Sequence, residues 1–199
     1  MTQSSLCPAS FSLLATTPEA WIQAVLADFD QFLLDHAAAE RKASAMAVSF
    51  VVQYPDKPKL HLPLIRLARE ELLHFQQVTR LLHKRGLVWV RDEKDPYIRD
   101  LIQHLSTDTD LRLLDRLLMG GVVEARGVER FGLVGEHLTD TKLAAFYQRL
   151  SQSEANHADL FLRLARHYFE AEQISERLDR WLRLEAHAMR NTPIRAALH

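Results

Sequence analysis

Cysteine is nearly absent from this sequence, with Cys7 as the single one among 199 residues. One cysteine cannot form an internal disulfide, and it excludes zinc and iron–sulfur sites built from several thiolates. No run of apolar residues approaches the roughly 20 that a membrane-spanning helix needs, and the N-terminus lacks the pattern of a signal peptide. These absences predict a soluble, intracellular protein of the reducing cytoplasm.

Glycine and proline are also scarce, at six and seven residues, and the formal net charge is only −1. A near-neutral chain has no overall attraction for nucleic acid or for an anionic membrane, so a polyanion would have to bind a local patch. Leu, Ala, Glu and Arg are plentiful, which is typical of long helices. We therefore predict an all-α fold, with residues 1–199 forming a single domain.

The helical pattern is interrupted at a few capping residues, prolines and glycines. Residues 1–16 show no clear period and are expected to form a poorly specified arm. The predicted helices span about 17–53 with a break near 28–30, 63–85, 110–138, 141–172 and 174–189. A segment of residues 86–109, with a short helix near 98–104, is expected to cross from one helix pair to the other.

Two copies of a Glu-x-x-His motif organise the chain. Glu71 and His74 lie one turn apart on the same helix face, and so do Glu154 and His157. Both pairs have apolar neighbours at helical intervals: Leu64, Leu67, Ala68, Phe75 and Val78 for the first, and Tyr147, Leu150, Ala158, Phe161 and Ala165 for the second. The motif side chains should therefore point into a core, where a carboxylate needs a partner.

Each motif also follows a single glutamate on a mostly apolar helix face. Glu40 lies 31 positions before Glu71, and Glu124 lies 30 positions before Glu154. With 13 Glu and 10 His in the chain, chance gives roughly 0.65 pairs at the Glu-x-x-His spacing, so the motif alone means little. Two pairs on apolar faces, each preceded by a glutamate at a matching distance, predict a metal site instead of a set of purely structural core residues.

The chemistry of this ligand set favours two iron or manganese ions. A Glu from each of two helices and a Glu-x-x-His from each of two others are the ligands that helical bundles use for di-iron and di-manganese centres. Four carboxylates balance the charge of two divalent ions, and oxygen-rich ligation with two imidazoles differs from copper or structural zinc sites. The predicted metal ligands, which would also be the catalytic residues, are Glu40, Glu71, His74, Glu124, Glu154 and His157.

Three further features leave alternatives open. His36, one turn before Glu40, is either a hydrogen-bond partner of a metal ligand or a core histidine. Gly120, Gly121 and Gly127 surround Glu124, which suggests that space is needed for a metal, a substrate or a helix bulge. Residues 57–94 hold nine Lys and Arg against four Asp and Glu. With Trp89 and Tyr97 nearby, this segment is either a surface for RNA or an ordinary solvated face.

Around these residues the sequence resembles the ferritin-like di-iron carboxylate proteins, from about residue 30 to residue 170. It looks most like the tRNA-(2-methylthio-N6-isopentenyladenosine) hydroxylases, the MiaE family, in its length, its ligand spacings and the stretch Asp35-His36-Ala37-Ala38-Ala39-Glu40-Arg41-Lys42-Ala43-Ser44. The resemblance implies a ferritin-like four-helix bundle with a crossover segment and extra terminal helices. It implies that the six residues named above bind two iron ions.

The resemblance also implies the reaction. It is O2-dependent hydroxylation of the isopentenyl group of the modified adenosine next to the tRNA anticodon. Electrons would come from a separate reductase, because the sequence has no flavin or nicotinamide motif. Three alternatives remain open at this point: a ferritin-like iron oxidase or storage protein, a di-iron oxygenase of a small molecule, and a non-catalytic helical module.

Overall fold

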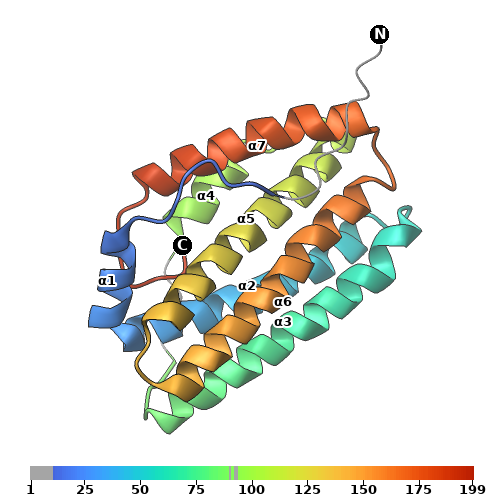
Figure 1. Ribbon diagram of the computed structural model, residues 1–199. Helices are drawn as coiled ribbons and strands as arrows, with labels where there is room; N and C mark the ends of the chain where they lie inside the picture. Colours follow the sequence, from blue (N-terminus) through green and yellow to red (C-terminus); the bar gives the residue numbers. More distant parts are fainter. Residues whose placement is uncertain (1–10, 90, 92–93) are drawn as a thin grey trace. The chain divides into compact units, whose positions relative to one another are not determined.

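The computed structural model describes residues 11–89, 91 and 94–199. Within these residues the chain forms seven α-helices and no strand, which confirms the predicted all-α class (Figure 1). The helices are α1 (Glu19–Ala27), α2 (Phe29–Gln53), α3 (Pro58–Lys84), α4 (Pro96–Ile102), α5 (Thr109–His137), α6 (Thr141–Ala165) and α7 (Ala171–Asn191). Cys7 and most of the predicted N-terminal arm lie outside the described residues.

Aspartates begin most of the helices. Asp28, Asp95, Asp108 and Asp140 each accept a backbone N–H of the first turn that follows, which satisfies donors that the helix itself leaves without a partner. Asp28 also separates α1 from α2, at the predicted break. The predicted start of the second long helix at Pro63 was wrong: α3 begins at Pro58, and Pro63 lies inside it. Pro58 takes the first-turn position, where the absent N–H costs nothing.

The chain divides into two compact units. One contains α1–α3 with residues 194–198, and the other contains α4–α7 with the described residues 11–17 and His199. That residues 1–199 form a single domain remains a prediction. None of the helices in the described part of the chain is long and apolar enough to span a membrane.

In the first unit, α2 and α3 form an antiparallel hairpin around the turn at residues 54–57 (Figure 1). Its buried side chains include Leu33, Ala37, Phe50, Leu64, Leu67 and Val78. The Ser44 hydroxyl donates a hydrogen bond of 2.8 Å to the carbonyl oxygen of Ala68, which fixes the register of the two helices. The C-terminal segment is attached as well, since Trp21 Nε1 donates to the Ala197 carbonyl and Leu198 N donates to Asp35.

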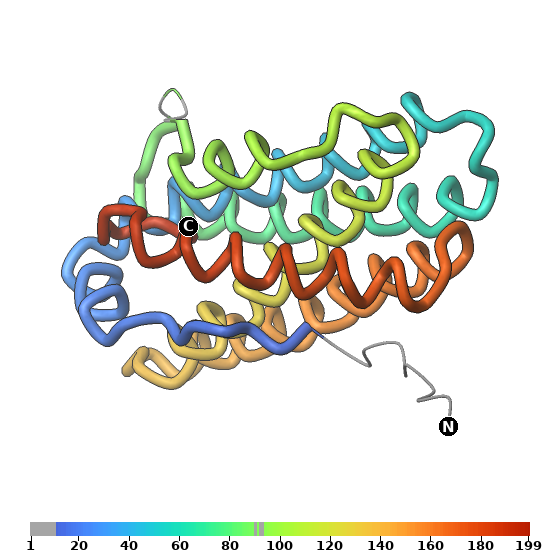
Figure 2. The backbone as a smooth tube through the Cα atoms, turned by 90° about the horizontal axis from the view of Figure 1, so that it is seen from above, coloured from blue at the N-terminus to red at the C-terminus, as the bar shows by residue number. Residues whose placement is uncertain are grey.

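In the second unit, α5 and α6 form the other hairpin, and they run side by side in Figure 2. The glycines of α5 permit this close packing. A Cβ at Gly120 would lie 2.9 Å from the Phe161 ring, and one at Gly121 would overlap the ring of Phe11. A Cβ at Gly135 would lie 3.2 Å from the backbone of α6. Side chains and backbone of the protein therefore occupy the space at these glycines.

Two buried carboxylates attach α7 to the rest of this unit. Glu185 accepts hydrogen bonds from Arg126 Nε at 2.7 Å and from the Tyr97 hydroxyl at 3.1 Å. Asp115 accepts from Trp181 Nε1 at 2.8 Å and from Arg177. Burial, together with the neighbouring Glu185, raises the pKa of Tyr97 well above its ordinary value. The phenol therefore stays protonated and donates to Glu185.

The described part of the predicted arm is held against α5. Arg126 Nη2 donates to the Ala15 carbonyl at 2.8 Å, and Thr17 donates to Glu129 from its backbone N–H and its hydroxyl. Burial lowers the pKa of the nearby Arg130 to about 10, so this guanidinium is still charged at neutral pH. Residues 11–17 are therefore attached by charged groups that the period of the sequence does not reveal.

Candidate metal centre

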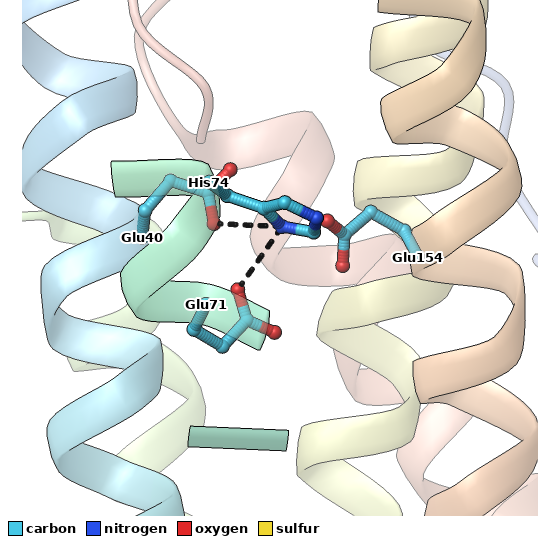
Figure 3. Close-up of side chains that lie close together, drawn as sticks. All are labelled: Glu40, Glu71, His74 and Glu154. Carbon is cyan, nitrogen blue, oxygen red and sulfur yellow. Dashed lines mark ion pairs between the residues drawn. The ribbon is translucent and has the colours of Figure 1, made fainter. Parts of the chain in front are cut away.

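The α2–α3 hairpin brings three of the predicted ligands together. His74 Nδ1 lies 3.6 Å from an oxygen of Glu40 and 3.6 Å from an oxygen of Glu71. Figure 3 draws these two ion pairs as dashed lines. Glu40, Glu71 and His74 are 4%, 1% and 7% exposed. Glu71 and His74 meet because they are one turn apart on α3, whereas Glu40 is positioned by the register of the hairpin.

A buried histidine holds the carboxylate of Glu40. His36 Nε2 lies 2.7 Å from Glu40 Oε1, and the His36 side chain is fully buried beside the Phe32 ring. Of the two alternatives that the sequence leaves for His36, this contact favours the role of a hydrogen-bond partner that orients a metal ligand.

The α5–α6 hairpin brings the other three predicted ligands together. Ligand atoms of Glu124, Glu154 and His157 lie within 4.8 Å of one another, as do those of Glu40, Glu71 and His74 in the first hairpin. His157 Nδ1 is 2.9 Å from Glu154 Oε2, and both side chains are buried. Gly127 lies beside this carboxylate, because a Cβ there would be 3.8 Å from Glu154 Cγ.

The two hairpins share a contact that sequence inspection missed. Ser151 Oγ on α6 donates a 2.8 Å hydrogen bond to the Val128 carbonyl on α5, as Ser44 on α2 does to Ala68 on α3. In both cases the bond joins the position four after the single glutamate to the position three before the motif glutamate. The serine is on opposite partners of the two pairs, so no repeated serine position reveals it in the sequence. This bond sets the same register in both halves.

Each set of three residues fits a hard divalent cation. Two carboxylates and one imidazole supply oxygen and nitrogen donors of the kind that iron and manganese bind. Two such sets carry four carboxylates, and without cations these buried groups would cost several kcal/mol each or take up protons. The described residues thus contain two buried Glu and His clusters that could hold metal ions.

Other singled-out aromatic residues lie elsewhere. Tyr147 is fully buried and packs on Phe131 with ring centroids 5.8 Å apart, so its role is structural. Tyr97, named with Trp89 beside the basic segment, is not part of an exposed surface, because its side chain is fully buried and bonded to Glu185. Trp89 is 37% exposed and packs against Phe75 with ring centroids 5.3 Å apart. Of these, Trp89 is the aromatic that solvent reaches.

The fold has a close relative among solved structures. Protein 43 with aldehyde deformylating oxygenase activity, from Synechococcus, superposes with a TM-score of 0.89 over 94% of each chain at 35% sequence identity. This match confirms the predicted ferritin-like fold.

Characterised relatives point to one family. Two proteins named tRNA 2-(methylsulfanyl)-N(6)-isopentenyladenosine(37) hydroxylase match the chain. The one from Pseudomonas putida is 39% identical over 163 residues, which is 80% of this chain and 77% of that protein. The one from Salmonella typhimurium is 35% identical over 123 residues, 62% of this chain and 45% of that protein. The model of the tRNA-(MS[2]IO[6]A)-hydroxylase (MiaE) family matches residues 4–199, and the chain therefore belongs to this family of hydroxylases.

Proposed function

We propose that the protein is an O2-dependent di-iron monooxygenase that hydroxylates the isopentenyl group of 2-methylthio-N6-isopentenyladenosine in tRNA. The observation that carries this proposal is the family match over residues 4–199, because that range includes all six predicted ligands. The buried Glu and His clusters support it, since they could hold the iron that would supply O2 chemistry. A cytoplasmic location is part of the proposal, and the tRNA substrate and the single cysteine support it.

In this proposal the carboxylates of Glu40, Glu71, Glu124 and Glu154 and the imidazoles of His74 and His157 hold two iron ions. Bound and reduced iron would supply the activation of O2. The chain itself contributes the fixed position of each ligand. His36 orients Glu40, and the Ser44 and Ser151 bonds fix the registers that place the single glutamates beside the motifs. Burial of the ligands keeps bulk water from the reacting groups.

The C-terminal part of α3 and the loop after it supply a surface for RNA phosphates. Arg80, Lys84, Arg91 and Lys94 are exposed there, and Arg85 pairs with Asp30 at 2.5 Å. The exposed ring of Trp89 offers a face on which a splayed-out base can stack. Glu71, one of the four acidic residues counted in this segment, is buried, so the exposed charge is more basic than the sequence count suggests.

The test is a nucleoside mass analysis of tRNA carrying the 2-methylthio-isopentenyl modification. The iron-loaded, chemically reduced protein is incubated with this tRNA and O2, and the modified nucleoside should gain one oxygen atom. Glu71→Ala should abolish the gain, whereas Glu70→Ala should preserve it, because Glu70 is the adjacent but exposed carboxylate. An unchanged nucleoside after oxidation of the iron would reject the proposal.

The structural relative favours a second candidate function. Its aldehyde deformylating oxygenase activity makes an aldehyde a possible substrate of this chain, since the two share 35% identity and nearly their whole length. The same reduced protein would then consume an aldehyde and release its formyl carbon while leaving the tRNA unchanged. Parallel incubations with the tRNA and with a long-chain aldehyde distinguish the two reactions.

A further inference from the structure

The outer face of the α2–α3 hairpin exposes several large apolar side chains. Leu62, Ile65 and Leu72 lie one or two turns apart on α3 and form one row. Val48 and Val52 lie one turn apart on α2 and form another. We name these side chains the α2–α3 outer patch: Val48, Val52, Leu62, Ile65 and Leu72, which are 49%, 71%, 66%, 42% and 50% exposed. Contiguous exposed apolar surface of this kind marks an interaction site.

The two rows lie beside the same seam between the helices. Ser44 contacts Ala68 across the seam. Val48 follows Ser44 by one turn and Ile65 precedes Ala68 by one turn, so in an antiparallel hairpin the two lie at the same level. The patch therefore extends over both helices and is not a set of scattered surface residues.

The charge around the patch is positive. Arg66 and Arg69 are exposed between the apolar residues of α3, and Arg41 and Lys42 are exposed on α2. The whole of α3 contains two carboxylates, Glu70 and the buried Glu71, and residues 41–53 of α2 contain none. A second copy of the chain would place cations against cations, which disfavours self-association. The partner that this surface complements is acidic with an apolar centre.

The patch also lies behind the predicted ligands. Glu40, Glu71 and His74 are on the inner faces of the same two helices. A partner on the outer face is thus separated from them by the thickness of one helix, about 10–12 Å with side chains. Electrons cross such distances in proteins readily. An RNA backbone would gain nothing from the apolar rows, because RNA interfaces are polar and strongly charged.

We infer that the α2–α3 outer patch is the docking surface of an acidic electron-carrier protein. The inference rests on the proposed function, in which a C–H bond, O2, two electrons and two protons give a C–OH group and one water. Two molecules of a one-electron carrier dock in turn, each supplies one electron, and both are oxidised. Transient redox complexes have small interfaces, below about 1,200 Å² in total, so a patch over two helices suffices.

The test uses a plant-type ferredoxin, a small acidic [2Fe–2S] carrier, as the probe. The first measurement is calorimetric binding of oxidised ferredoxin to the oxidised, iron-loaded protein at low salt, which involves neither tRNA nor catalysis. Replacing Arg66 and Arg69 together by Glu should weaken binding about tenfold or more, and Ile65→Asp should weaken it similarly. The control replaces Arg149 and Arg163, exposed cations of α6, by Glu and should leave binding unchanged.

The second measurement is the rate at which reduced ferredoxin reduces the iron-loaded protein in the absence of O2. The patch variants should slow this rate at least as much as they weaken binding, while reduction by dithionite stays as fast as in the native protein. Equal loss in the α6 control, unchanged binding of the patch variants, or no binding of ferredoxin to the native protein would overturn the inference. Lost tRNA affinity with normal ferredoxin binding, or a native dimer that Ile65→Asp dissociates, would overturn it too. Failure of tRNA hydroxylation alone would instead reject the proposed function.

Discussion

Breaking the buried pair of Arg126 and Glu185 should destabilise the α4–α7 unit strongly. Both side chains are fully buried, and Arg126 donates to Glu185 from Nε at 2.7 Å and from Nη2 at 3.0 Å. Removing one partner of such a pair leaves an uncompensated charge and costs about 3–5 kcal/mol. The loss depends on which partner is removed, because the two residues have different remaining contacts.

Glu185→Leu should cost about 3 kcal/mol, the lower end of that range. Arg126 still donates to Glu129 and to the carbonyl of Ala15 in this variant, so its charge keeps a partner. Arg126→Met should cost about 4–5 kcal/mol. It leaves the Glu185 carboxylate with the Tyr97 hydroxyl as its donor among the contacts described above, and it also removes the hydrogen bonds from Arg126 to the Ala15 carbonyl and to the Thr17 hydroxyl.

The double variant with both substitutions should be destabilised by much less than the sum of the single variants. An apolar pair of similar volume leaves no buried charge, so the two effects should differ from additivity by at least about 2 kcal/mol. Urea unfolding of the metal-free protein, followed by far-ultraviolet circular dichroism, measures all three free energies. Additive losses, or single losses below about 1 kcal/mol, would refute the assigned role of the pair.

Three further outcomes are expected. His36→Leu should weaken Mn²⁺ binding at equilibrium about tenfold, because Glu40 loses the group that orients it. His36→Gln should restore part of the affinity. Equal affinity of His36→Leu and the native protein would contradict this role. Gly135→Ala should cost about 1–3 kcal/mol in urea unfolding, since its Cβ meets the α6 backbone, whereas Gly121→Ala displaces only the Phe11 ring and should cost less. Burial raises the pKa of Tyr97 above its ordinary value of 10.0, so the unfolded chain loses that proton first and stability falls as pH rises through this region. Tyr97→Phe should therefore lose less stability than the native protein between about pH 9 and pH 11, and an identical pH profile would show that Tyr97 does not contribute.

The sequence by itself determined most of the helices, and it predicted a ligand set whose members within each hairpin lie close together in the structure. The apolar period and the capping aspartates are local features, so they placed α2, α5 and α7 close to their observed bounds. The start of α6 was also correct, but the helix ends at Ala165 and not near residue 172 as predicted. The spacing of Glu71 and His74 on one helix face is local in the same way, because a helix brings residues three apart together wherever it lies. The start of α3 was misplaced because both Pro58 and Pro63 are compatible with a first turn, and local propensity does not choose between them.

Tertiary structure decided which helix faces are covered and by what. The role of His36 depended on its burial, and the bonds of Ser44 and Ser151 depended on the register between helices, neither of which a single helix specifies. Gly120 and Gly121 suggested space for a ligand, but the rings of Phe161 and Phe11 fill it, whereas Gly127 lies beside Glu154. Tyr97 was expected near a surface, but its ring is buried and its hydroxyl donates a hydrogen bond to Glu185 on α7. In each case the deciding contact joins residues far apart in the chain, and such contacts depend on packing between helices, not on the period within one.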